Sequence, residues 1–496
     1  MRPALLLCLL SLAAGARDPV YDRGPLRHPS LEPVEYRVVI DNGASHRARV
    51  EMVIRGYGDA PLDVAMAAWT PGAYQLVVPA RNLGELSVRS EPAGPTSLVR
   101  QGRETWRVQA PPGSSVTLSY TVFLPKSSVI TSTVQADFAT LTGFDVYLAV
   151  VGNEATRCRL FLAPYSDWRA VVPLPQATDG AFEAPSYDVL IDSPALMGVL
   201  EERVVTASGR RHHLVWSGTT DLDIDRFASD VTRLVPAVTA AFGGAAPPYS
   251  EYWFLSRFEN GGGGGLEHAA SARIDDVPSH DTPAARQRFL GVMAHELVHA
   301  WNVKRIRPSS LGPFDYHREA DTRDLWFLEG VTSYIAELAL VRAELSTPEA
   351  LFETVAAALE AYEATPARRF MGPEESGQTA WYRSDEGASG RTNYYNVGFL
   401  LGLALDLVLQ GAGGLDAMLA RLYSAFDGSG APYPEGGLRA AAVSTGGPRL
   451  NGFFEQHVLG TQRPPIDELL MVVGLTRETK PGRRVAWLGL TAATDG

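Results

Sequence analysis

The first third of the chain alternates hydrophobic and polar positions with the period of two that is typical of half-buried β-strands. The clearest examples are residues 36–40, 48–54 and 115–123, which are rich in β-branched and aromatic side chains. Polar and glycine residues such as those at 41–43 separate these stretches and predict turns. Short strands at this spacing predict a β-sandwich-like domain over residues 17–185.

The pattern changes near residue 250, where a helical period replaces the alternation. A short apolar strand at residues 252–255 and a run of glycines at residues 261–265 come first. Thr282 followed by Pro283 is typical of a helix start, with threonine as the N-cap and proline at the first helical position. The apolar face that follows predicts a helix that ends before Pro308, because proline cannot continue it.

Two further helices follow from the same periodicity, one from Thr347 to about Ala364 and one over residues 394–409. The second part of the chain, residues 186–464, is therefore expected to be mostly helical beside a small sheet. Together with the β-rich part, this pattern predicts a multidomain α+β protein.

Composition and charge narrow the function classes. The chain is 45% apolar and 20% charged, as ordinary globular proteins are. Its net charge of -12 argues against nucleic acid as a partner, because phosphate binding needs a basic face.

The start of the chain has the features of a secretory signal peptide over residues 1–16. Arg2 supplies the positive charge, residues 4–12 supply the apolar core, and residues 14–16 form a small-residue cleavage site. The apolar run is too short to span a bilayer, and the sequence has no second long run. We therefore expect an exported protein, secreted or periplasmic, without an integral membrane span.

The central chemical signal is the pair His295 and His299 with Glu296 between them, inside the helix predicted from Thr282. Residues at i and i+4 lie on one helical face, so both imidazoles can reach one metal ion at about 2.0 to 2.1 Å. This spacing is typical of zinc peptidases, in which the glutamate takes a proton from the water that attacks the substrate. We therefore expect Zn²⁺ as the cofactor, His295 and His299 as its ligands and Glu296 as the catalytic carboxylate.

The third ligand has to come from elsewhere in the chain. The metzincin class would need glycine at position 302 and histidine at position 305, where this sequence has Asn302 and Arg305. Glu329 lies in an apolar helical segment, where an unpaired carboxylate would be costly and a metal ion would remove that cost. We therefore favour Glu329 as the third ligand over its two rivals, His317 and Glu319, which lie in a polar stretch.

Longer segments around these residues resemble the glycyl aminopeptidase family of gluzincin zinc metallopeptidases. The matching segments, in the family's order, are WTPGAY at 69–74, ARN at 80–82, GGGGGLEHAAS at 261–271, HELVHAWNVKRIRP at 295–308, LWFLEGVTSY at 325–334, YYNVGFLLGLALDL at 394–407 and FFEQHVLGT at 453–461. The resemblance implies a β-rich N-terminal domain, a thermolysin-like catalytic domain and a C-terminal PDZ domain. Residues 465–496 are accordingly expected to be a linker and the truncated start of a PDZ-like domain.

The resemblance also implies roles for residues near the metal ligands. Glu267 corresponds to a glutamate that binds the free amino terminus of a peptide through charge-assisted hydrogen bonds. Gly264 and Gly265 let the substrate backbone approach closely. Tyr395 corresponds to a tyrosine that stabilises the oxyanion of the tetrahedral intermediate, although periodicity alone does not separate it from Tyr394.

Three function classes follow from these residues. The first is an aminopeptidase that removes small N-terminal residues, glycine and alanine, from peptide substrates with a free N-terminus. The second is a thermolysin-type endopeptidase, which Glu267 argues against because a bound ammonium ends the substrate at its first residue. The third is a non-catalytic binding protein on a peptidase scaffold, which would have no need of Glu296.

Overall fold

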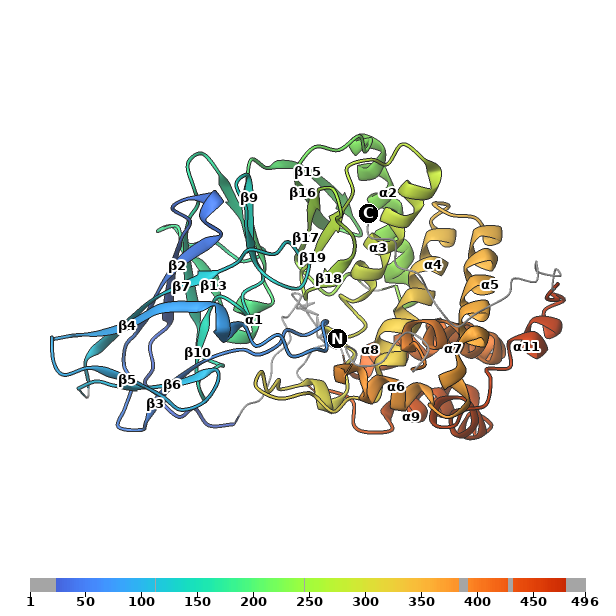
Figure 1. Cartoon of the computed structure of the whole chain (residues 1–496). Helices are drawn as coiled ribbons and strands as arrows, with labels where there is room; N and C mark the ends of the chain where they lie inside the picture. Colours follow the sequence, from blue (N-terminus) through green and yellow to red (C-terminus); the bar gives the residue numbers. More distant parts are fainter. Residues whose placement is uncertain (1–23, 112, 245, 383–390, 427–430, 479–496) are drawn as a thin grey trace, which may run out of the picture.

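The computed structural model places three parts next to one another: a β-rich N-terminal domain, a five-stranded sheet and a group of helices (Figure 1). The residues that the structure describes are 24–111, 113–244, 246–382, 391–426 and 431–478. The expected signal peptide and the end of the expected PDZ-like segment lie outside these residues. The expectation of a β-rich domain followed by a mostly helical catalytic part is confirmed.

The N-terminal domain is built from sheets whose strands alternate buried and exposed residues, as the sequence predicts. Its largest sheet has six strands in the order β13-β11-β1-β2-β7-β4. The strands are β1 (Val34–Val39), β2 (Arg47–Ile54), β4 (Leu83–Glu91), β7 (Ser115–Phe123), β11 (Cys158–Ala163) and β13 (Phe182–Ala184). The pairing of β2 with β7 is antiparallel and runs without a break from Arg47–Phe123 to Ile54–Val116.

A four-stranded sheet covers the buried face of the six-stranded one and shares its core. It contains β3 (Leu62–Met66), β5 (Ser97–Arg100), β6 (Thr105–Gln109) and β10 (Leu148–Val150). The hydroxyl of Tyr36 in β1 donates to the main-chain oxygen of Leu148 in β10, at 2.7 Å. The two sheets are therefore joined by a polar contact as well as by apolar packing.

A third sheet in this part has the order β12-β14-β9-β8. Its strands are β8 (Thr133–Val134), β9 (Phe138–Leu141), β12 (Arg169–Val171) and β14 (Ala195–Gly198), and the short helix α1 (Tyr187–Ile191) precedes β14. β14 lies beyond residue 185, where the sequence places the end of the domain. Its pairing with β9 and β12 keeps it in the N-terminal part, a long-range contact that periodicity cannot show.

The middle layer is a mixed sheet of five strands in the order β15-β16-β17-β19-β18. Its strands are β15 (Glu201–Ala207), β16 (Arg210–Ser217), β17 (Glu251–Phe258), β18 (Gly265–Glu267) and β19 (Ser271–Asp276). Among the described strands, β18 forms one edge of this sheet and pairs only with β19, in antiparallel orientation. The glycine run found in the sequence therefore leads directly into an edge strand.

The helices lie beyond this sheet, with α2 and α3 between it and the outer helices α4 and α5 (Figure 1). They are α2 (Ile224–Ala241), α3 (Pro283–Val298), α4 (Thr332–Arg342), α5 (Pro348–Ala364), α6 (Pro373–Gln378), α7 (Tyr394–Leu409), α8 (Gly414–Ala425), α9 (Gly437–Gly446), α10 (Leu450–Phe453) and α11 (Ile466–Val472). There are also two π-helical segments: η4 (Trp326–Val331) leads directly into α4, and η8 (Phe454–Leu459) directly follows α10. The three helices expected from the sequence correspond to α3, α5 and α7.

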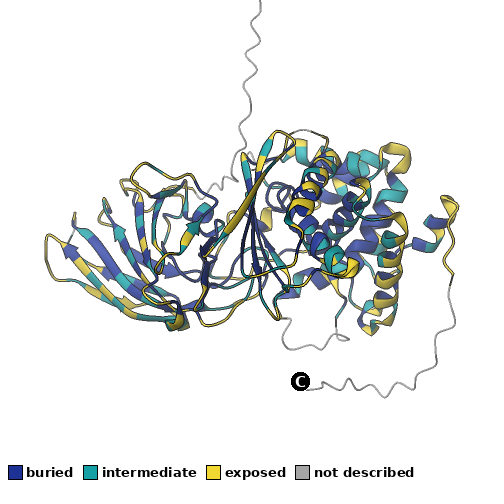
Figure 2. Cartoon of the chain, turned by 90° about the horizontal axis from the view of Figure 1, so that it is seen from above, coloured by how far each residue is buried: buried dark blue, intermediate teal, exposed yellow. Residues whose placement is uncertain are grey.

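The hydrophobic core is divided between the two domains, and each core contains an aromatic side chain from the other domain. Tyr74, from the loop after β3, packs in the core of the helical domain and is 1% exposed. Tyr316, from the loop after α3, packs in the core of the N-terminal domain and is 5% exposed. Figure 2 shows the dark buried colour running through both domains and the layer between them.

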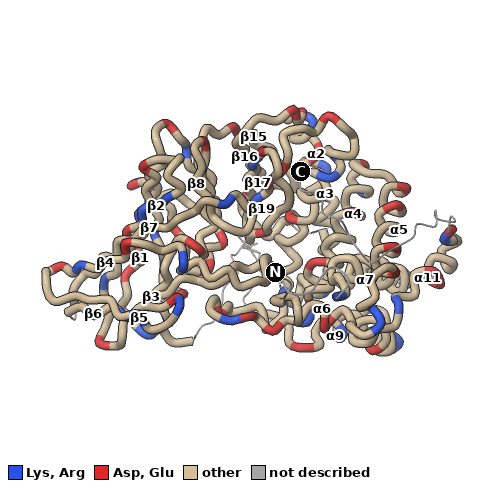
Figure 3. Tube along the Cα trace, viewed as in Figure 1, with Lys and Arg blue, Asp and Glu red and all other residues tan. Residues whose placement is uncertain are grey.

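Basic and acidic residues are interspersed along the trace of the chain in Figure 3. The segment Tyr394–Ala412 is long and apolar enough to cross a membrane by length and composition alone. Within the described residues, however, α7 contacts η4, α4, α5 and α8, and most of its side chains are buried. Its apolar composition is therefore accounted for by its place in the protein core.

Candidate metal centre

The last turns of α3 carry the two histidines. Thr282 caps the helix by accepting a hydrogen bond from the main-chain nitrogen of Ala285 at 3.1 Å, and Pro283 occupies the first turn. The helix ends at His299, one turn after His295, and the two Nε2 atoms lie 2.9 Å apart. The pattern at i and i+4 thus places both imidazoles on one side of the helix, as expected.

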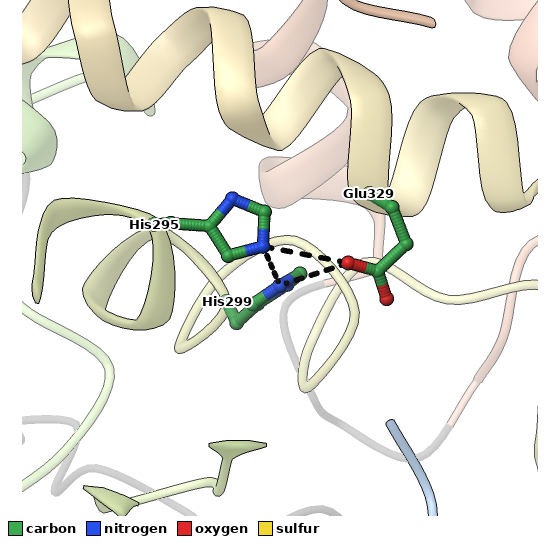
Figure 4. Close-up of side chains that lie close together, drawn as sticks. All are labelled: His295, His299 and Glu329. Carbon is green, nitrogen blue, oxygen red and sulfur yellow. Dashed lines mark hydrogen bonds and ion pairs between the residues drawn. The ribbon is translucent and has the colours of Figure 1, made fainter. Parts of the chain in front are cut away.

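The third group of the cluster is the carboxylate of Glu329, in the π-helical segment η4 that leads into α4. Its Oε2 lies 3.4 Å from Nε2 of His295 and 3.4 Å from Nε2 of His299 (Figure 4). Four ligands at about 2.0 to 2.1 Å in tetrahedral geometry are separated by about 3.3 Å from one another. The triangle of these three atoms therefore has the size of one face of such a tetrahedron.

Both imidazoles are held by their other nitrogen. Nδ1 of His299 donates to the main-chain oxygen of Asn302 at 2.8 Å. Nδ1 of His295 lies 3.2 Å from Oγ of Ser333, whose own hydrogen is donated to the main-chain oxygen of Glu329. With Nδ1 protonated in each ring, the Nε2 lone pairs point at one another and at Glu329.

This donor set fits a metal cation. Three acceptor atoms converge, and Oε1 of Glu329 is buried with no hydrogen-bond partner among the described residues. A cation is the group that would satisfy all three ligands at once.

Glu296 projects beside the three ligands and is 5% exposed. Burial raises its pKa well above the usual range, and the nearby carboxylates of Glu267 and Glu329 add to this effect. An ideal β-carbon on Gly265 would lie only 2.3 Å from Oε1 of Glu296, so the carboxylate rests against the bare main chain of β18. Glycine at this position therefore makes room for Glu296, a reason that the sequence does not reveal.

Glu267 ends the edge strand β18 and is 3% exposed. One of its carboxylate oxygens lies within 4.8 Å of ligand atoms of both Glu296 and His299. Its Oε1 has no hydrogen-bond partner among the described residues. The structure thus brings the predicted amine-binding carboxylate directly beside the three candidate metal ligands, at the end of the strand that forms the edge of its sheet.

The two tyrosines at the start of α7 have different surroundings. The ring of Tyr395 lies 6.1 Å from the ring of His295, whereas Tyr394 is 3% exposed and packs in the core. The contact between η4 and α7 is very close, because an ideal β-carbon on Gly330 would lie 2.4 Å from the α-carbon of Gly398. This pair of glycines therefore lets Tyr395 approach the cluster.

The rival ligands lie elsewhere. His317 and Glu319 occupy the loop between α3 and η4. Within the part of the chain that the structure describes, the clusters suited to a metal ion are His295 with His299 and Glu329, and Glu267 with Glu296 and His299. Neither cluster includes His317 or Glu319, so the geometry favours Glu329.

Sequence reasoning did not find the residues that support the ligands. Asn302 accepts from His299 with its main chain, and its side chain donates to the main-chain oxygen of Phe327 and to Oγ1 of Thr332. It therefore ties α3 to the segment that carries Glu329. The sequence gives one indication of this role, because Asn302 follows His299 within one helical turn. The contact of its side chain with the distant segment around Phe327 cannot be read from the sequence.

Two family profiles match the sequence. The profile of the peptidase M61 N-terminal domain matches residues 35–199, and the profile of the M61 glycyl aminopeptidase matches residues 288–401. Together the two matches span more than half of the chain. Among curated proteins, none matches the sequence significantly.

Solved structures share the fold at low sequence identity. An aminopeptidase N family protein from Idiomarina loihiensis has a TM-score of 0.83 and 24% identity, over 88% of this chain and 78% of that chain. An M1 zinc metallopeptidase from Deinococcus radiodurans, bound to a Tyr-Ser-Ala substrate, has a TM-score of 0.58 and 15% identity, over 91% of this chain and 99% of that one. Yeast LTA4 hydrolase has a TM-score of 0.54 and 10% identity, over 91% of this chain and 71% of that one.

Proposed function

The chain belongs to the M61 glycyl aminopeptidase family and is a metallopeptidase, and we propose from this premise that it is a zinc-dependent aminopeptidase. It hydrolyses the peptide bond that follows a small N-terminal residue, glycine or alanine. The observation that carries the proposal is the position of Glu267. Its buried carboxylate lies within 4.8 Å of ligand atoms of His299 and Glu296, which is shorter than two extended residues, at about 3.3 to 3.6 Å each.

Zinc is the proposed ion because two imidazole nitrogens and one carboxylate oxygen are a typical set of three protein ligands in catalytic zinc sites. His295, His299 and Glu329 would hold it. When bound, zinc supplies Lewis-acid chemistry: it acidifies water and polarises the carbonyl of the substrate. The zinc metallopeptidase from Deinococcus radiodurans, which shares the fold, supports this choice of ion.

Glu296 is the proposed general base. Its carboxylate lies beside the ligands without belonging to the His295, His299 and Glu329 triangle, and it is shielded from solvent. From there it takes a proton from the attacking water and later delivers it to the leaving amine.

Tyr395 is the proposed oxyanion donor, since its ring faces the ring of His295 at the start of α7. A phenol hydroxyl aimed at the developing negative charge stabilises the tetrahedral intermediate. β18 has a neighbour on one side only among the described strands, so its outer edge, which begins at Gly265 directly after Gly264, offers main-chain groups to the substrate backbone. These groups orient the peptide, while Glu267 binds its ammonium group.

The preference for glycine and alanine rests on the family's description as glycyl aminopeptidases. Action after export, in the periplasm or outside the cell, is part of the same proposal and rests on the signal-like residues 1–16. The competing activity is that of a thermolysin-type endopeptidase, which would have no use for a buried carboxylate where the substrate's amino end lies.

The test compares free and N-acetylated anilides of glycine, alanine and leucine, each with and without a chelator and with zinc restored. We expect hydrolysis of the free-amine glycine and alanine substrates, loss of activity with chelator and recovery with zinc. Losing a buried charge partner costs about 2 to 5 kcal/mol, so Glu267→Gln should lower kcat/KM on free-amine substrates about 30-fold or more. Cleavage of acetylated substrates as fast as free ones by the wild-type protein would instead identify an endopeptidase.

A further inference from the structure

Glu267 is covered by a loop of the other domain. Gly72, in the loop after β3, has a φ of +94°, and an ideal β-carbon there would lie 2.5 Å from Oε2 and 2.7 Å from Oε1 of Glu267. Both carboxylate oxygens therefore pack against the bare α-carbon of Gly72. No other residue type fits this position unless either the loop or the carboxylate moves.

The loop that carries Gly72 is fixed on both sides. Trp69 is fully buried, and its indole nitrogen donates to the main-chain oxygen of Asp315 at 2.9 Å. Tyr74 packs in the core of the helical domain and contacts the ring of Trp381. The main chain of Ala73 closes a turn by donating to the oxygen of Thr70. Residues 69–74, which we call the interdomain loop, are thus held rigidly against the catalytic part.

This placement limits the space on the amino side of the substrate. A carboxylate oxygen of Glu267 lies within 4.8 Å of a ligand atom of His299, and an extended residue spans only about 3.3 to 3.6 Å. The main chain of Gly72, from the N-terminal domain, packs against both oxygens of this carboxylate. Val129, also from the N-terminal domain, lies near the start of β18: an ideal β-carbon on Gly264 would lie 3.9 Å from one of its methyl groups.

We propose that the interdomain loop is part of the substrate site: Gly72 positions the carboxylate of Glu267 and forms the wall that ends the site after one residue. Gly72 is thus a positioning residue that determines exopeptidase specificity, and the N-terminal domain is required for that specificity. The inference rests on the proposed aminopeptidase function and adds to it the element that fixes the amine-binding carboxylate.

The experiment substitutes Gly72→Ala and compares it with Gly180→Ala. Gly180 has a similar φ of +89° in the same domain, but an ideal β-carbon there has nothing within 4 Å. Gly180→Ala therefore reproduces the backbone strain of a positive φ without the contact. Substrates are free and N-acetylated alanine anilides, and each variant is also measured for zinc content and Tm.

The added methyl group displaces the carboxylate of Glu267, and a misplacement near 1 Å can lower rates by about 100-fold. We expect Gly72→Ala to lower kcat/KM on the free-amine substrate at least about 10-fold, mainly through KM, and to leave the acetylated substrate within about 2-fold. Gly180→Ala should keep wild-type values for both. A folded Gly72→Ala protein that keeps the wild-type preference for free amines would overturn the inference and leave the proposed function standing.

A second comparison shows whether Gly72→Ala acts by displacing the carboxylate of Glu267 or by disturbing the fold in general. It remains informative if Gly72→Ala alone folds poorly. Glu267→Asp shortens the side chain by one methylene and frees the space that the alanine would need. Adding Gly72→Ala to Glu267→Asp should therefore change kcat/KM less than about 2-fold, so the two substitutions are far from additive. Full additivity of the two losses would show that Gly72 does not act through Glu267. A wild-type protein with no preference for free amines would refute the proposed function itself.

Discussion

The imidazole of His299 donates to the main-chain oxygen of Asn302 at 2.8 Å, and the side chain of Asn302 reaches the segment that carries Glu329. One residue thus sets the position of two metal ligands on different helices. Groups that orient metal ligands in this way typically contribute about 10- to 100-fold to metal affinity.

Asn302→Asp should therefore lower zinc affinity by about 10- to 100-fold, because a carboxylate would face the main-chain oxygen of Phe327, where the amide now donates. The affinity is measured by competition with a chromogenic chelator. Asn396→Asp, on a nearby helix but outside the metal cluster, serves as the control. Wild-type affinity in the Asn302 variant would show that the ligands are positioned without it.

Glu329→Ala should abolish stoichiometric zinc binding, because two imidazoles alone leave the site with one of its three protein ligands missing. Zinc content of the purified protein, measured by elemental analysis, should fall from one ion per chain to a small fraction. Glu319→Ala and His317→Ala are the matched controls, since both residues lie in the loop between α3 and η4. If either control loses zinc and Glu329→Ala keeps it, the third ligand is misassigned.

Glu296→Gln should leave zinc bound and lower kcat by about 100- to 10,000-fold, the usual range for general acid–base help. The amide retains the shape of the side chain against Gly265 but cannot accept the proton. Zinc content and kcat are measured on the same preparation. A variant that keeps more than about a tenth of the wild-type kcat would assign the base to another group.

Tyr395→Phe should lower kcat by about 100- to 1,000-fold, the effect of removing one oxyanion donor. Tyr394→Phe is the control, because Tyr394 is buried in the core of the helical domain, while the ring of Tyr395 lies 6.1 Å from the ring of His295. Steady-state kinetics on the free-amine alanine anilide separates the two. A larger loss in Tyr394→Phe than in Tyr395→Phe would reverse the assignment.

Stability should depend on the ionisation of Asp324, which lies before η4 and accepts a hydrogen bond from Tyr433 at 3.0 Å. Burial raises its pKa to about 6, and the Tyr433 hydrogen bond offsets only part of this effect. The folded protein therefore holds this proton more tightly than the unfolded chain. The contribution of Asp324 to the free energy of unfolding is fully present below about pH 4 and is lost as pH rises through about 6.

Asp324→Asn should remove this pH-dependent loss of stability, because an amide does not ionise. The difference in unfolding free energy between the variant and the wild type should grow by on the order of 1 kcal/mol from pH 5 to pH 8, which corresponds to about 1 °C in Tm for a chain of this length that melts as one unit. The exposed neighbour Asp321→Asn should show no such trend. A Tm difference that stays constant across this range would mean that Asp324 ionises as easily in the folded protein as in the unfolded chain.

Local rules predicted the helices of the catalytic part well. Thr282 and Pro283 mark the start of α3, and Thr347 marks that of α5, because caps and prolines act within one helical turn. Helix spacing also brings His295 and His299 together, and the cost of a buried carboxylate indicates Glu329.

The remaining features depend on contacts between distant segments. Gly72 and Glu267 are far apart in sequence, and nothing in the local pattern of either shows that they meet. The same holds for Gly330 and Gly398, whose contact brings α7 against η4. The π-helical geometry at Glu329 is a further case, because an apolar helical segment has the same pattern whether it is α or π.

The exchange of Tyr74 and Tyr316 between the two cores bears on how the molecule moves and unfolds. Separating the domains would withdraw a large aromatic side chain from each core and leave two cavities, at a cost of several kcal/mol. A hinge motion between the domains would therefore carry this cost each time it occurred. The same exchange couples the stability of the two domains, so heat or denaturant should melt them in one cooperative transition.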